Sequence, residues 1–175
     1  MEALDRDGNT ALHLAVSKRR LETARLLVAK KTGIEILSRM ENATSLMLAV
    51  DNDDEKMTQV LLDYGARLET QDPFDYTALH RAAFRNALKA GETLIRNGAD
   101  MAKPGNYGWT PLHCAVHRGH REFVQLLLEK GADISVRDKG WRTPRQLASS
   151  KEIYDLLSDH EACGQVNQTV EARNL

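Results

Sequence analysis

The chain has 175 residues, of which 28% are charged and 42% hydrophobic, and its formal net charge is −1. This balance argues against a dedicated nucleic-acid-binding protein, which usually carries a basic excess. The sequence also shows no secretory leader, no apolar run near the ~20 residues of a membrane span and too few cysteines for a disulfide framework, so we expect an intracellular protein, cytoplasmic or nuclear, with no membrane partner.

A short phrase that begins with threonine recurs along the chain. It starts at Thr10, Thr44, Thr77, Thr110 and Thr143, so successive copies lie 34, 33, 33 and 33 residues apart. A period near 33 residues is typical of a stack of repeats rather than of a single globular core. The phrase predicts a domain over residues 1–160 whose repeats span 5–38, 39–71, 72–104, 105–137 and 138–159.

Repeat one has the sequence of an internal repeat rather than of a polar cap. Leu12, Leu14, Ala15, Leu26 and Leu27 are all apolar, although the ends of a stack need polar outer faces. We therefore expect either that the chain is a piece of a longer array or that a partner covers this end.

Repeat two contains an acidic run, residues 51–55, after its first helix. One interpretation is an acidic patch that contacts a partner of mixed charge. The other is a solvated turn in which Asp54 and Glu55 lie near the positive end of the next helix.

Repeat three has the weakest second helix, because Gly91 stands where repeat four has Val124. A glycine inside a helix costs roughly 0.5–1 kcal/mol relative to alanine. We interpret this helix as a candidate soft spot, with simple sequence drift as the alternative.

Repeat four is the fullest copy. Thr110 is suited to cap its first helix and Pro111 to occupy the first turn, where a missing amide proton costs nothing. Gly119 is expected to end this helix in a left-handed conformation, as Asn86 does in repeat three. The second buried stripe is predicted from apolar residues at helical spacing: Phe123, Val124, Leu127 and Leu128.

Repeat five is predicted to be a degenerate C-terminal cap. Arg145 stands where repeat four has Leu112, and about four residues are missing between Ala148 and Leu156. Residues 161–175 carry no apolar pattern, and we expect a disordered tail there.

The phrase Thr110-Pro-Leu-His and its four in-phase copies resemble the ankyrin repeat. The resemblance implies an all-α fold, an ankyrin-repeat solenoid of stacked helix-turn-helix units with β-hairpin-like finger loops. It also implies a non-catalytic protein–protein interaction module that binds a partner protein or peptide in its concave groove. The alternative is a structural or autoinhibitory segment of a larger multidomain protein, such as an enzyme, channel, receptor or effector.

In that family the concave surface comes from the fingertips and the exposed side of each first helix, and here aromatic and arginine residues gather in repeats three and four. Such residues often dominate binding energy. We expect a monomer whose protein partner offers acidic and apolar contact residues, although Tyr76 and Trp109 could instead pack between fingers. The candidate contacts are Phe74, Tyr76, Arg81, Phe84, Arg85, Tyr107, Trp109, His117 and Arg118, and Cys114 is also expected on the exposed side of its helix.

No catalytic residue set, cofactor site or metal site is predicted. His113, His117 and His120 lie close together in the sequence with Cys114, which resembles a set of metal ligands. However, these side chains are expected to point in different directions, and the histidine of each phrase is expected to bond nearby backbone.

Overall fold

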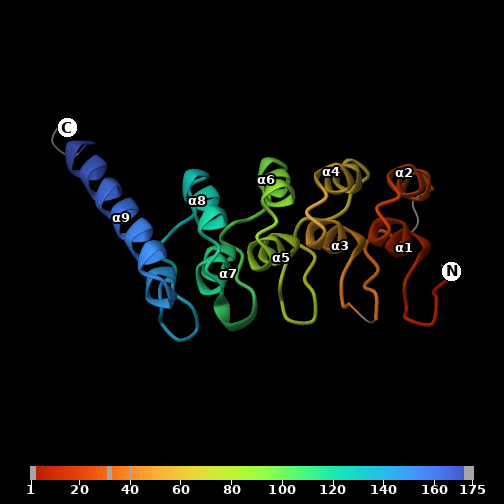
Figure 1. Cartoon of the computed structure of the whole chain (residues 1–175), viewed down its shortest axis with the longest axis horizontal. Helices are drawn as coiled ribbons and strands as arrows, with labels where there is room; N and C mark the ends of the chain where they lie inside the picture. Colours follow the sequence, from red (N-terminus) through yellow and green to blue (C-terminus); the bar gives the residue numbers. More distant parts are fainter. Residues whose placement is uncertain (1–2, 31–32, 40, 172–175) are drawn as a thin grey trace.

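The computed structural model describes residues 3–30, 33–39 and 41–171, with side chains as far as residue 162. Over these residues the chain forms helices and loops without a β-strand, in a single row (Figure 1). The all-α solenoid predicted from the sequence is confirmed. Its elements are α1 (Ala11–Ser17), α2 (Leu21–Ala29), α3 (Ser45–Asp51), α4 (Glu55–Asp63), α5 (Ala78–Arg85), α6 (Leu88–Arg96), η1 (Asn106–Gly108), α7 (Pro111–Arg118), α8 (Arg121–Glu129), η2 (Pro144–Leu147) and α9 (Lys151–Glu171).

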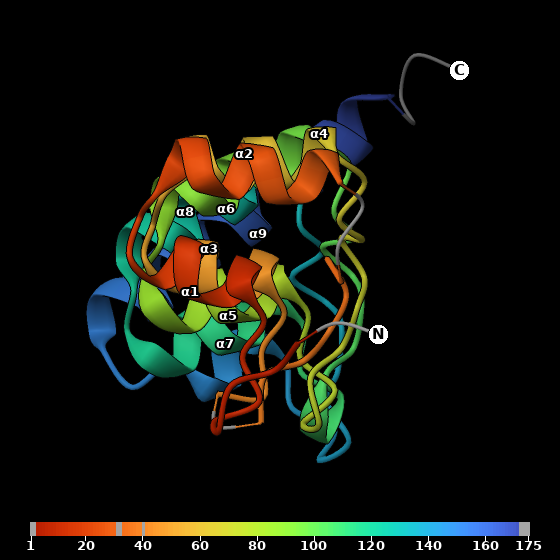
Figure 2. The same cartoon turned by 90° about the vertical axis from the view of Figure 1, so that its right-hand side faces the viewer.

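The helices form two layers. Viewed along the row, the first helices α1, α3, α5 and α7 make one layer and the second helices α2, α4, α6 and α8 make the other (Figure 2). The finger loops project together from one side of the first layer, below the helices in Figure 1. Each repeat therefore contributes one finger to a continuous row.

The phrase threonines cap the first helices of repeats one to four, and in three of these repeats a histidine completes the cap. The backbone N–H of Thr77 donates to His80 Nδ1 at 3.2 Å, and the Thr77 and His80 pair forms a capping box. Because Nδ1 accepts, Nε2 carries the proton and donates to the carbonyl oxygen of Trp109 in the next repeat, at 2.9 Å. Burial lowers the pKa of His80 to about 4.

The same link joins other pairs of repeats. His13 Nε2 lies 3.2 Å from the carbonyl oxygen of Ala43, and His113 Nε2 lies 3.2 Å from that of Arg142. Burial also lowers the pKa of His113. The expectation that these histidines bond to backbone and join the stack is confirmed.

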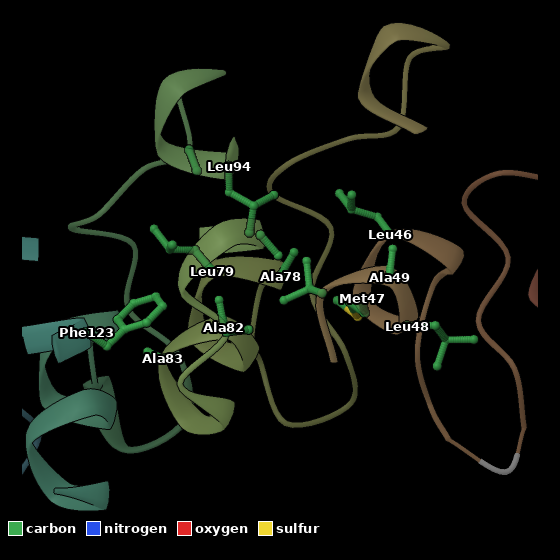
Figure 3. Packing of buried hydrophobic residues seen from close by; sticks show 14 of the residues in the cluster. Leu46, Met47, Leu48, Ala49, Ala78, Leu79, Ala82, Ala83, Leu94 and Phe123 are labelled. Atoms are coloured by element: carbon green, nitrogen blue, oxygen red, sulfur yellow. The ribbon is translucent and has the colours of Figure 1, made fainter. Parts of the chain in front are cut away.

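Small residues let the first helices approach closely. Ala49, Ala82 and Ala115 occupy the same place in consecutive repeats and are fully buried. Leucine, methionine and valine side chains fill the space between these helices and the second layer (Figure 3). The first helices of repeats three and four end as predicted, with Asn86 at φ 55° and Gly119 at φ 76°.

Gly91 has a packing role that neither interpretation of repeat three included. A Cβ built on Gly91 would lie 2.6 Å from both Cε2 and Cζ of Phe123, a distance that requires one of the two residues to shift. The Phe123 ring of repeat four is fully buried and points at α5, toward Ala82 and Ala83 (Figure 3). The glycine therefore makes room for a large side chain of the next repeat.

The fifth repeat is shortened as predicted, and its end differs from the prediction. Only η2 replaces the first helix, while Ile153 and Leu157 of α9 pack into the core. We expected a disordered tail from residue 161, but α9 continues to Glu171, and residues 172–175 lie outside the described residues. Its packed first turns provide the costly nucleus of a helix, and no proline follows to stop its extension.

Candidate functional site

A groove lies where the finger of repeat three meets the first helices of repeats two and three. Its hollow has a volume of about 230 Å³ and is lined by Asp51, Asp72, Phe74, Tyr76, Arg81, Phe84 and Arg85. A second hollow of about 470 Å³ shares Asp51, Arg81 and Arg85 with the first and adds Glu41 and Asn52. The two hollows therefore form one groove that extends from repeat three to repeat two.

Arg81 lines both hollows of this groove and makes two ion pairs. Its guanidinium binds Asp51 through two nitrogens and contacts Asp72 at 3.4 Å, while Arg85 reaches Asp51 at 3.6 Å. Burial alone lowers the pKa of Arg81, but the hydrogen bonds and charges of Asp51 and Asp72 raise it overall. The groove is thus balanced in charge rather than basic.

The sequence interpretation included Asp51 in the acidic run of repeat two but did not predict that Asp51 and Asp72 pair with Arg81 in the groove. Asp51 is 30 residues from Arg81 in sequence, so no local pattern shows their contact. Asp54 follows the second interpretation, because its Oδ1 accepts the Met57 N–H at 3.1 Å at the start of α4. Asp53 makes a contact that neither interpretation included: its Oδ1 accepts the N–H of Ala90 in the next repeat at 2.9 Å. The repeat spacing also predicts Met40, Glu41 and Ala43 at the fingertip of repeat two, and Met40 lies outside the described residues.

The two arginines of this network should respond differently to truncation. The Arg81 side chain is 18% exposed and the Arg85 side chain 61%. We expect Arg81→Ala to lower the free energy of unfolding by about 2 kcal/mol, because it leaves two enclosed carboxylates without their partner. Arg85→Ala on the same helix is the matched control and should change it by less than about 0.5 kcal/mol. Equal losses in urea denaturation would contradict the assignment of Arg81 as the structural member.

A chain of aromatic contacts continues from the groove into repeat four. Tyr76 meets Phe84 edge-on at 5.0 Å between ring centroids, Phe84 lies 6.5 Å from Trp109, and Trp109 lies 4.7 Å from His117. The ring centroid of Tyr107 lies 6.3 Å from that of Trp109. The structure therefore brings together the aromatic candidates of repeats three and four.

Two of these aromatics also have a structural role. Burial raises the pKa of Tyr76 to about 12. The Tyr76 ring lies directly against Gly105 of the next finger. Trp109 Nε1 donates to Asp138 Oδ2 at 3.2 Å. Packing between fingers thus applies to both residues, whereas Phe74 is 56% and Tyr107 62% exposed.

The remaining candidates on α7 separate into surface and core. His117 and Arg118 are exposed, but Cys114 is fully buried, so its expected place on the exposed side of this helix is wrong. Burial raises the pKa of the Cys114 thiol. Cys114 occupies a position that faces the core because α7 packs against both α5 and η2.

The three neighbouring histidines do not converge. His113 Nε2 faces the carbonyl oxygen of Arg142, the His117 ring packs against Trp109 at a tilt of 56°, and His120 Nε2 lies 3.1 Å from the carbonyl oxygen of Phe84. Among the residues that the structure describes, no group of three or more histidine, cysteine, aspartate or glutamate side chains could hold a metal ion.

The fingertips hold one feature that the sequence interpretation missed. The residue two places before each phrase threonine has a positive φ in all five repeats: Gly8, Asn42, Asp75, Gly108 and Trp141. Glycine, asparagine and aspartate tolerate this left-handed conformation, which costs about 1–2 kcal/mol for other residues. Trp141 adopts it at φ 62° while 77% of the side chain is exposed. The sequence signal that could have indicated a turn at Trp141 is the neighbouring Gly140.

Within the described part of the chain, no helix is both long enough and apolar enough to cross a membrane.

Comparison with known proteins agrees with the repeats seen in the structure. A family model described as "Ankyrin repeats (3 copies)" matches residues 46–138, and one described as "Ankyrin repeat" matches residues 7–39. The B-cell lymphoma 3 protein homolog of Mus musculus is 33% identical over 94 residues, which are 54% of this chain and 21% of that protein. The chain therefore spans about a fifth of the length of this relative. With its stacked helix pairs and these matches, the chain belongs to the ankyrin repeat family, whose repeats generally mediate protein–protein interactions.

Proposed function

We propose that this chain is a non-catalytic, intracellular protein-interaction module that acts as a monomer. It docks a folded partner or an extended peptide on the concave surface made by the fingers and first helices, centred on repeats three and four. The observation that carries the proposal is the exposure of Phe74, Arg85 and Tyr107 around the groove. Exposed aromatic side chains beside a hollow are costly in water and are typical of binding surfaces.

The charges indicate where a partner makes polar contacts. Because Asp51 and Asp72 neutralise the charge of Arg81, this arginine contributes little to the attraction of an acidic partner. Arg85 and Arg118 are exposed on consecutive first helices. A partner with apolar residues for the hollow and acidic residues for these two arginines fits the surface best.

The proposal is tested by a triple variant on this surface. We expect Phe74→Ala, Arg85→Ala and Tyr107→Ala together to weaken binding by at least about thirtyfold, or ~2 kcal/mol, since aromatic and arginine anchors dominate interface energies. The partner is first captured from a cell extract with the unchanged chain, and affinities are then measured by calorimetry. Circular dichroism verifies that the variant keeps its helices.

A matched control removes similar side chains from the second-helix layer. Leu26→Ala, Tyr64→Ala and Arg96→Ala truncate three exposed residues of α2, α4 and α6 or their ends. This control should bind like the unchanged chain. If the control loses the partner and the groove variant keeps it, the interaction surface lies on the other layer and the proposal is wrong.

One observation favours a second candidate, a segment that stacks on another part of a larger protein. Leu14 and Leu26 on repeat one are exposed, whereas Leu48 and Val60 occupy the same places in repeat two and are buried by repeat one. Slower hydrogen exchange of α1 and α2 in the parent protein than in this chain would support this candidate. Equal exchange would remove it.

A further inference from the structure

Three consecutive fingertips each carry an exposed aromatic side chain: Phe74, Tyr107 and Trp141. Two of them, Tyr107 at φ 58° and Trp141 at φ 62°, hold a left-handed backbone conformation that bulky residues rarely adopt. Neither strain nor exposure of an aromatic ring stabilises the fold. Strained and exposed residues of this kind indicate a function, and the row extends the proposed interaction surface beyond repeats three and four.

The fingers that carry these residues are fixed to one another. The backbone N–H of Lys139 in the fifth finger donates to the carbonyl oxygen of Tyr107 in the fourth, at 2.8 Å. The ring of Tyr76 in the third finger packs against Gly105 of the fourth. A ligand therefore meets a preorganised row, which lowers the entropy cost of binding.

The period of the row selects the conformation of its ligand. Each finger has two arms that hydrogen-bond to each other, as Asp138 N–H does to the carbonyl oxygen of Arg142 at 3.0 Å. Hydrogen-bonded chain segments lie about 4.7–4.9 Å apart, which sets the width of one finger. Neighbouring helices pack about 8–10 Å apart, and because each repeat contributes one finger, this distance is the period of the row.

A polyproline-II helix rises about 9.3 Å in three residues and completes one turn, so every third residue faces the same side. In a β-strand, residues three apart face opposite sides. An α-helix needs seven residues and about 10.5 Å to return to one face. A period of about 8–10 Å is therefore matched by three residues of a polyproline-II helix, whereas the repeat of the α-helix is longer than this range.

The charges of the fingertips set the direction of the ligand. In the fifth finger Arg142 neutralises Asp138, since two of its nitrogens lie 3.0 and 2.8 Å from Asp138 Oδ2. Arg137 and Lys139 are exposed beside Trp141, and Asp75 is exposed on the third fingertip. A complementary ligand therefore has its acidic residues over repeat five.

We propose that this fingertip row binds a polyproline-II segment of a protein partner, with proline at every third position and acidic residues at the end that meets Trp141. Aromatic rows recognise such segments because the ring faces pack on proline and the segment is already extended before it binds. This inference rests on the proposed protein-binding function and names the class of ligand.

The test uses synthetic peptides and two versions of the chain. Two peptides carry prolines at positions 1, 4 and 7. In one of them two glutamates follow the last proline, and in the other two glutamates precede the first proline. A control peptide has the same composition with prolines at every fourth position, and another replaces the glutamates with lysines. Calorimetry measures affinity, and the difference in tryptophan fluorescence between the unchanged chain and Trp141→Gly separates Trp141 from Trp109.

We expect one of the glutamate peptides with three-residue spacing to bind at least about tenfold more tightly than both controls and to shift the emission to shorter wavelength. Trp141→Gly should lose this binding while the melting temperature stays equal or rises, because glycine is suited to φ 62°. Four outcomes overturn the inference. Trp141→Gly could lose binding together with a lower melting temperature, or the spacing control could bind equally well. The chain could prefer an amphipathic helical peptide, or it could bind neither glutamate peptide.

The same variants separate this inference from the proposed function. If Trp141→Gly still captures the cellular partner and the Phe74, Arg85 and Tyr107 variant does not, the groove binds a partner and the fingertip inference alone is wrong. If neither change affects capture, the proposed binding surface also fails.

Discussion

Phe123→Ala is expected to lower the free energy of unfolding by about 5 kcal/mol, the upper end of the roughly 3–5 kcal/mol that a buried aromatic residue loses. The ring is fully buried and lies against Gly91 of the preceding repeat. Because a glycine offers no side chain that could move into the vacated space, the cavity cannot collapse easily. Urea denaturation followed by circular dichroism measures the loss. Phe74→Ala removes an exposed ring of the same size and should change stability by less than about 0.5 kcal/mol.

The contact with Gly91 can be separated from the cavity by a double-mutant cycle. Gly91→Ala alone should destabilise by about 1–2 kcal/mol, because the clash with the ring outweighs the improved helix propensity. In a Phe123→Leu background the same change should be neutral or stabilising. If Gly91→Ala destabilises equally in both backgrounds, the two residues are not coupled and the packing role of Gly91 is wrong.

The stability of the stack should fall by roughly 3 kcal/mol between pH 6.5 and 4 through His80 alone. Burial lowers the pKa of His80 to about 4 in the folded chain, against about 6.5 when unfolded. Folding therefore favours the neutral ring, and its contribution is fully present above pH 6.5 and is lost as the pH falls toward 4. Protonation of Nδ1 would also remove the acceptor of the Thr77 N–H.

His80→Gln is the variant that isolates this effect. Glutamine fills the same role in the fifth repeat, where Gln146 Oε1 accepts the Thr143 N–H at 2.9 Å. We expect the variant to be less stable than the unchanged chain at pH 7 but to lose less stability by pH 4.5 in urea denaturation. His117→Gln on the exposed side of α7 should retain the original pH profile. Identical profiles for His80→Gln and the unchanged chain would show that His80 is not the responsible group.

The helix caps could be predicted from the sequence because their causes are local. A threonine before an apolar helix and a glycine or asparagine after it act over a few residues, and Thr110, Asn86 and Gly119 adopt the predicted roles. The interpretation of Gly91 failed for the opposite reason. Its partner Phe123 is far away in the sequence, and the contact arises only when the repeats stack.

The candidate surface shows the same division. The aromatic residues whose positions were predicted by counting from each phrase threonine do lie together, because the repeat fixes their place in each unit. The neutralisation of Arg81 by Asp51 and Asp72 depends on rotamers and on neighbouring repeats, which no spacing reveals. Trp141 differs from the other residues only in its backbone conformation and its exposure, which the spacing of the phrases does not reveal.

The histidine links between neighbouring repeats have a consequence for how the chain folds and yields to force. His13, His80 and His113 each bridge about 30 residues of sequence, so the chain closes only short loops as each repeat joins the stack. Such local closure favours fast folding that starts at one pair of repeats and spreads outward. Held between two beads in an optical trap, the chain should lengthen in steps of one repeat and recoil in the reverse order.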